Sequence, residues 1–148
     1  MMNNIRVLRA EEEWQRAGAY MVRIQGMNRE YGISLREEID EHDGEGTRYI
    51  VLLDGEYPVA TCRFYEIAPG TVMLGRVVVL PEYRGQQLGL AAVQQAEQWM
   101  RELGYAEVKI ESRVEAVGFY LKQGYTAEDD TVFQNSVFQC INMKKKLN

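Results

Sequence analysis

The sequence predicts an α/β (α+β) fold, in which helices cover a mixed, mostly antiparallel sheet. Residues 48–80 have the pattern of successive strands, with turn signals at Asp54-Gly55 and Pro69-Gly70 between apolar runs. Helical spacing of apolar residues precedes this region, and helices and strands alternate after it. Strands that run together and then alternate with helices are typical of a sheet covered by helices. The 148 residues contain no repeat or low-complexity tract, so we expect one domain, residues 1–148.

The amino-terminal third is expected to hold one strand and two helices. Residues 5–8 alternate as a short strand does, and residues 11–31 have helical spacing that ends at Gly32. Residues 35–41 predict a second, shorter helix, because the hydroxyl of Ser34 can cap its exposed amides. One face of the longer helix carries Trp14, Ala17, Met21, Ile24 and Met27.

The rest of the chain predicts a meander followed by alternating elements. The strands of the meander are residues 48–53, 59–67 and 71–80. A helix follows before Gly104, with Leu88, Ala92, Ala96, Trp99 and Leu103 facing inward. The last elements are a strand at 106–110, a helix at 114–123, and strands at 125–128 and 132–145.

Composition and charge limit the classes of function. The net charge is −5, and the basic residues are scattered apart from three lysines at 144–146, which argues against a nucleic-acid partner. Two cysteines, no apolar stretch of membrane-spanning length and no leader-like amino terminus predict a cytoplasmic protein without membrane contact. His42 is the only histidine, and zinc chemistry or a Ser-His-Asp triad would need partners that the sequence does not identify. We therefore expect no metal.

The stretch VVLPEYRGQQLGLA at 78–91 has the pattern of a phosphate-binding junction. A continuously apolar run, typical of a strand buried on both faces, leads into a turn and then into a helix. The unpaired N–H groups of a helix start attract anions, and Arg84 adds a fork of charged donors. Short glycine motifs are weakly specific, so this stretch alone leaves an ordinary turn equally open.

With its flanks, GRVVVLPEYRGQQLG resembles the acyl-CoA-binding motif of the GNAT N-acetyltransferase superfamily. The family loop reads Arg or Gln, two residues, Gly, one residue, then Gly or Ala. Counted from Arg84, Gln87 stands where the family has Gly, and Gly89 matches; a register from Gln86 also fits, but would push the loop into the helix. The resemblance implies that acetyl-CoA is bound by Val77, Val78, Val79, Arg84, Gly85, Gln86, Gln87, Leu88, Gly89 and Leu90.

A second segment, AVGFYLKQGY, resembles the family's Ala, Phe-Tyr and Gly-Tyr pattern. Tyr120 then takes the position where many members place a phenol beside the coenzyme sulfur, and a phenol is protonated at neutral pH. The amino-terminal half is similar to the ElaA-like and YjcF-like branch. The resemblance covers the chain from about residue 5 to 147 and implies a sheet of six to seven strands flanked by about four helices.

The carboxyl-terminal stretch FQNSVFQCINM departs from that branch. Cys140 stands where a histidine is usual, and in related enzymes this histidine can act as a general base. A thiol in an apolar strand has a raised pKa, so Cys140 is a poor base. A water chain, a carboxylate such as Glu66, an amine that arrives neutral, or loss of catalysis remain as alternatives.

The function expected from the resemblance is transfer of an acetyl group from acetyl-CoA to a primary amine of a small molecule, through a tetrahedral intermediate and with Tyr120 as the acid. Arg63 and Arg113 are candidate acceptor-binding residues together with Cys140, and the two arginines would favour an anionic acceptor. The alternatives are a non-catalytic acyl-CoA-binding module and an enzyme acting on a protein or peptide amine. A homodimer is possible.

Overall fold

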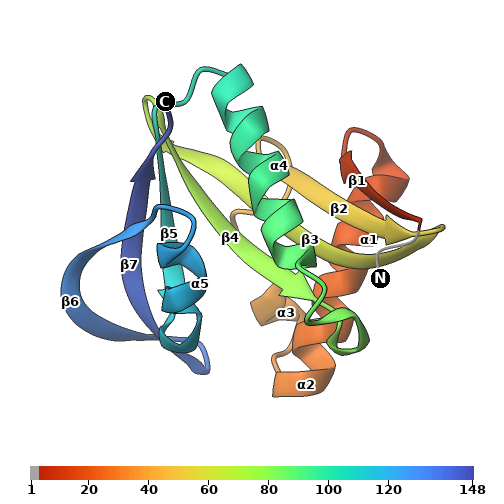
Figure 1. Ribbon diagram of the computed structural model, residues 1–148. Helices are drawn as coiled ribbons and strands as arrows, with labels where there is room; N and C mark the ends of the chain where they lie inside the picture. The colour runs from red at the N-terminus through yellow and green to blue at the C-terminus, as the bar shows by residue number, and fades with distance from the viewer. Residues whose placement is uncertain (1–3) are drawn as a thin grey trace.

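The computed structural model describes residues 4–148, in which seven strands form one sheet (Figure 1). The strand order is β1-β2-β3-β4-β5-β7-β6, and only β4 and β5 are parallel neighbours. The strands are β1 (Ile5–Arg9), β2 (Arg48–Asp54), β3 (Tyr57–Ala68), β4 (Thr71–Val79), β5 (Glu107–Arg113), β6 (Thr126–Asn135) and β7 (Phe138–Lys146). The predicted mixed, mostly antiparallel sheet with flanking helices is confirmed.

Helices lie on both faces of this sheet. In Figure 1, α4 (Leu88–Glu102) crosses the front of the sheet and α1 (Glu13–Arg23) lies behind it. The short helices α2 (Arg29–Tyr31) and α3 (Leu35–Glu38) lie near the end of β4, and α5 (Val117–Leu121) lies beside β5. No helix in residues 4–148 is long and apolar enough to cross a membrane.

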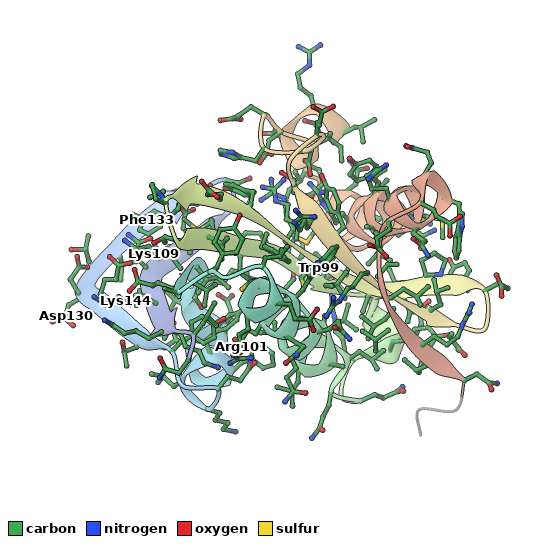
Figure 2. The ribbon with its side chains drawn as sticks, turned by 90° about the horizontal axis from the view of Figure 1, so that it is seen from above. Trp99, Arg101, Lys109, Asp130, Phe133 and Lys144 are labelled. Atoms are coloured by element: carbon green, nitrogen blue, oxygen red, sulfur yellow. The ribbon has the colours of Figure 1, made fainter. Side chains whose placement is uncertain are left out.

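The core lies between α4 and the sheet. Cys62 and Phe64 of β3 are buried there, and the ring of Phe64 meets the indole of Trp99 edge to face at 5.7 Å. In the view from above, Trp99 lies over the sheet, and Asp130 and Phe133 lie at its β6 edge (Figure 2). The alternation along β3 that buries these residues leaves Arg63 and Tyr65 on the opposite face, which α4 does not cover.

Strands β4 and β5 pair over only part of their length. Thr71–Leu74 pairs with Glu107–Ile110, and beyond this point the two strands diverge (Figure 1). The divergence leaves the second half of β4 without a neighbour on its β5 side. Through this opening a ligand can reach the backbone of the second half of β4.

The long amino-terminal helix runs over residues 13–31 and ends at Gly32, as predicted, but its middle (Ile24–Asn28) is π-helical. Its inward face differs from the prediction, because its buried residues include Gly18, Ala19 and Val22. Trp14, expected on the same face as the inward residues, is 49% exposed. Small residues form the contact between this helix and the sheet. A Cβ added at Gly18 would lie only 3.1 Å from Pro58 Cγ of β3, so the helix packs closely here. Leu103, predicted to face inward, is 41% exposed.

The two carboxyl-terminal strands also differ from their prediction. The segment predicted as one strand, 132–145, contains a tight turn between β6 and β7. Ser136 in this turn has a φ of 57°, and the Gln134 side chain donates a hydrogen bond to its carbonyl. The Asn-Ser pair at 135–136 was therefore a turn signal inside an otherwise strand-like run.

Candidate active site

A large cleft opens between the diverging strands, with a volume of about 1850 Å³. It is lined by the second half of β4, the start of α4, α5, the end of β5, the β6–β7 turn and the α2–α3 region. Pockets for drug-sized ligands are about 300–1,000 Å³. This cleft can therefore hold a long ligand together with a second molecule.

The free edge of β4 supplies backbone groups to the cleft. The N–H of Leu80 is bonded to the carbonyl of Val59 in β3, so Val79, one residue earlier, directs its N–H and carbonyl away from β3. By the same alternation the backbone of Val77 faces the free edge, whereas Val78 pairs with Thr61 of β3 and its side chain packs against Gly26 of the π-helical segment. Two of the three predicted valines thus present backbone groups to the cleft.

A bulge interrupts β4 just before these valines. The register shifts between Thr61 and Arg63 of β3, and Arg76 opposite has a φ of 50°, a left-handed conformation that costs a non-glycine residue energy. The Arg76 side chain is bound to Glu38 (Nε to Oε2, 3.1 Å) and Asp40 (Nη2 to Oδ2, 3.0 Å). These ion pairs connect the α3 region to the bulge, and so hold the free edge of β4 in place.

The start of α4 leaves its first amides without protein partners. Gln87 is the N-cap with a φ of 62° and no side-chain cap, and the first turn contains no acidic residue. The first backbone bond of the helix comes from the Ala91 N–H to the Gln87 carbonyl, so the N–H groups of Leu88, Gly89 and Leu90 are free for an anion. Of the loop residues predicted to bind the coenzyme, only Gln86 does not line the cleft.

Arg84 lies at the same end of the cleft. Its guanidinium is paired with Glu30 of α2 (Nη2 to Oε1, 2.7 Å) and donates from Nε to the Val79 carbonyl at 3.2 Å. Because Arg84 is half-exposed, an incoming phosphate can compete with Glu30 for its donors.

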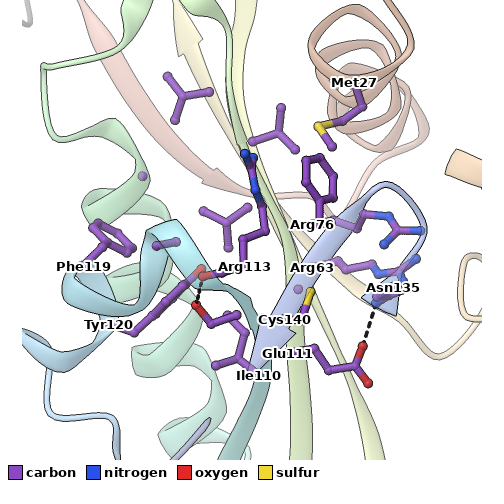
Figure 3. Close-up of a pocket in the computed structure, with 18 of the residues that line it drawn as sticks. Met27, Arg63, Arg76, Ile110, Glu111, Arg113, Phe119, Tyr120, Asn135 and Cys140 are labelled. Atoms are coloured by element: carbon purple, nitrogen blue, oxygen red, sulfur yellow. Dashed lines mark hydrogen bonds between the residues drawn. The ribbon is translucent and has the colours of Figure 1, made fainter. Parts of the chain in front are cut away.

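Tyr120 of α5 lines the cleft and is 5% exposed. Its hydroxyl has no hydrogen-bond partner among residues 4–148, and burial raises its pKa well above the ordinary value. In Figure 3, Phe119 and Tyr120 lie on one side of the pocket, and Arg63, Arg76 and Asn135 lie on the other. The phenol is therefore a neutral donor in the cleft that the open edge of β4 also lines.

Cys140 and Arg113 face each other across β7 and β5. Burial raises the pKa of the Cys140 thiol, so it stays protonated and is a poor base. The Arg113 guanidinium lies 4.0 Å from the centre of the Phe138 ring and contacts the Tyr31 hydroxyl and Glu115. Arg113 thus connects α2 to the start of β7.

A buried ion network that the sequence did not reveal surrounds Arg63. Its guanidinium binds both oxygens of Asp40 at 2.9 and 3.0 Å and lies 2.9 Å from Asp43. Arg23, which is fully buried in α1, binds Asp43 and Glu38. Residues 35–41 were predicted as one helix, but α3 ends at Glu38. Glu38, Asp40 and Asp43 instead neutralise buried arginines.

Two further groups considered in the sequence contact other side chains. Glu66 does not line the cleft and accepts a hydrogen bond from Tyr105 at the opposite end of β4. His42 stacks on Tyr65, with 4.3 Å between ring centres. Residues 4–148 contain no group of three His, Cys, Asp or Glu side chains placed to hold a metal ion.

The free strand edge, the open helix start and the phenol beside them are features that an acyl-transfer site uses. Residues 6–125 match the model of the acetyltransferase (GNAT) family, so the chain belongs to this family of acyl-transferring enzymes. The resemblance stated from the two sequence segments is confirmed.

Individual relatives agree with this assignment. The "Uncharacterized N-acetyltransferase YjcF" of Bacillus subtilis (strain 168) is 29% identical over 136 residues, which are 92% of this chain and 96% of that protein. A crystal structure of a "putative N-acetyltransferase" from Lactobacillus plantarum has a TM-score of 0.90 and 27% identity, and covers 99% of this chain and 100% of its own. Escherichia coli ElaA, at 18% identity, shares the fold with a TM-score of 0.81, covering 95% and 99%.

Proposed function

We propose that this protein transfers an acetyl group from acetyl-CoA to a primary amine of a small molecule. The observation that supports this function most is that one cleft contains three features: the free edge of β4, the unpaired amides of α4 and the Tyr120 phenol. Each suits one part of acetyl-CoA: its amide-containing arm, its pyrophosphate and its sulfur.

The donor would lie along β4 with its pyrophosphate on α4. The N–H and carbonyl of Val77 and the N–H of Val79 would bind the arm as a neighbouring strand does, while the Val79 carbonyl accepts its bond from Arg84. The amides of Leu88, Gly89 and Leu90 would bind pyrophosphate oxygens, with Arg84 released from Glu30 to join them. A free N–H at the bulge would polarise the thioester carbonyl.

The reaction itself would be direct attack by the amine on the thioester carbon. A tetrahedral oxyanion forms, the carbon–sulfur bond breaks, and Tyr120 gives its proton to the departing thiolate. Positioning of amine and thioester in one cleft would supply much of the rate. Because Glu66 lies outside the cleft and the Cys140 thiol stays protonated, we propose that the amine loses its proton to water.

Release of free thiol from acetyl-CoA across a panel of amines tests this function. We expect amine-dependent thiol release, with acetylated amine formed in equal amount. Tight acetyl-CoA binding without turnover on any amine would instead favour the non-catalytic module, to which Cys140 and Gln87 give some support as departures from the family pattern.

A further inference from the structure

Gly75 leaves an unfilled space in the floor of the cleft. It lies inside β4, where glycine is less favourable than a residue with a side chain. Its φ is not left-handed, and a Cβ added there would meet no atom within 4 Å. Neither backbone conformation nor packing therefore requires glycine, which leaves close approach of a ligand as its use.

The positive charges beside this space are already neutralised. Arg63 lies directly opposite Gly75 on β3, and its guanidinium is held by Asp40 and Asp43. Arg76, the next residue along β4, is held by Glu38 and Asp40. The charge of each arginine is balanced, so an anionic ligand over Gly75 would find only their Nε donors, which are buried without hydrogen-bond partners among residues 4–148.

Glu111 is the available charge on the other side of the space. It comes directly after Ile110, the last residue of β5 to pair with β4, and shares the face of Gly75. Its only partner is the Asn135 amide at 2.8 Å (Figure 3), and within residues 4–148 no cationic side chain lies within 4 Å of it. Arg113, two positions along the same face, turns instead to Tyr31, Phe138 and Glu115.

The carboxylate of Glu111 is the attractive group for a cation on this side. Tyr65, two residues from Arg63 on the same face of β3, lines the cleft, but His42 stacks on its ring and the Arg63 guanidinium lies 5.4 Å from the ring centre. An alkylammonium group is stabilised by a carboxylate through charge-assisted hydrogen bonds. Arg36 of α3 is the competing cation on this side, and it is exposed to solvent.

We propose that the space over Gly75 is the acceptor subsite and that Glu111 binds a second, positively charged group of the acceptor, which makes diamines the preferred class. This inference rests on the proposed function. It replaces the anionic acceptor that Arg63 and Arg113 suggested in the sequence.

Three acceptors of matched length test which charge the subsite prefers on the far end of the acceptor: 1,5-diaminopentane, 1-aminopentane and 5-aminopentanoate. We expect the lowest KM for the diamine. Glu111→Gln should raise the KM for the diamine on the order of 10-fold and leave that for 1-aminopentane unchanged. Preference for 5-aminopentanoate, or equal KM values for all three, would overturn the diamine assignment.

Gly75→Val tests whether the acceptor binds over Gly75. We expect acetylation of the diamine to be lost while acetyl-CoA affinity is kept and the Tm is equal or higher, because the new side chain meets no protein atom. Unchanged acetylation by this variant would show that the acceptor binds elsewhere.

A binding measurement separates this inference from the proposed function. We expect 1,5-diaminopentane to bind wild-type protein saturated with coenzyme A and to bind Glu111→Gln more weakly. Failure of acetyl-CoA to bind at all would overturn the proposed function. Coenzyme A binding followed by no diamine binding would overturn only the acceptor subsite.

Discussion

Tyr120 combines burial with an unused hydroxyl. Most buried tyrosine hydroxyls have a partner, as Tyr125 has in Glu97 at 2.7 Å. The Tyr120 hydroxyl lacks one among residues 4–148 and lines the cleft. A neutral, unpaired donor at the reacting sulfur is what an acid needs in order to act late in the reaction.

Changing Tyr120 to Phe should lower kcat on the order of 100-fold, because the thiolate then leaves without its proton donor. Acetyl-CoA affinity should be nearly unchanged, since the ring still packs beside Phe119. Steady-state kinetics with an active amine and calorimetry with acetyl-CoA measure the two quantities. An unchanged kcat would remove Tyr120 from the acid role.

Among the elements, the start of α4 carries the sharpest departure from the family motif. The backbone at Gln87 is left-handed, so glutamine occupies a conformation that suits glycine better. The amides that would bind pyrophosphate belong to the backbone of the next three residues, and a side chain at 87 does not remove them. The motif can therefore work without its central glycine.

Gln87→Gly should raise the free energy of unfolding by up to about 1 kcal/mol, since glycine relieves the left-handed strain at the N-cap. Acetyl-CoA affinity should stay within a few-fold of wild type. Urea denaturation and calorimetry check these two expectations. Destabilisation by the glycine would mean that the Gln87 side chain contributes a contact absent from the free protein.

The sequence predicted local patterns better than tertiary ones. Alternation and helical spacing located the meander, α4 and the loop at Arg84, because each depends on neighbouring residues. The ion pairs of Arg23 and Arg63 join residues far apart in the chain, so charge type alone could not show that they are buried. The bulge at Arg76 likewise depends on β3 and α3, which local pattern does not register.

The whole molecule depends on buried carboxylates for part of its stability. Burial opposes ionisation of Asp43, but hydrogen bonds and charge from Arg23 outweigh it and hold its pKa well below the usual range. Asp40 is likewise shifted downward, because Arg63 outweighs the effect of its burial. A lowered folded pKa gives stability that is present above the unfolded pKa, about 3.9, and is lost as pH falls.

We expect the free energy of unfolding to decrease as pH falls from about 5 toward 2. Asp43→Asn should cost about 3 kcal/mol near neutral pH, because Arg23 and Arg63 each lose one of their two charged partners, and unfolding of the variant should depend less on pH. Urea denaturation at several pH values measures both. Equal pH dependence in the variant would mean that other carboxylates control acid unfolding.

Binding of acetyl-CoA to the cleft is the central claim, and isothermal titration calorimetry tests it most directly. We expect wild-type protein to bind with a Kd on the order of micromolar, and Arg84→Glu to weaken binding at least about 10-fold by placing a carboxylate at the pyrophosphate. Arg6→Glu, an equal charge reversal on β1 outside the cleft, should leave the Kd unchanged. Absence of binding by the wild type, or equal weakening by both variants, would contradict the account.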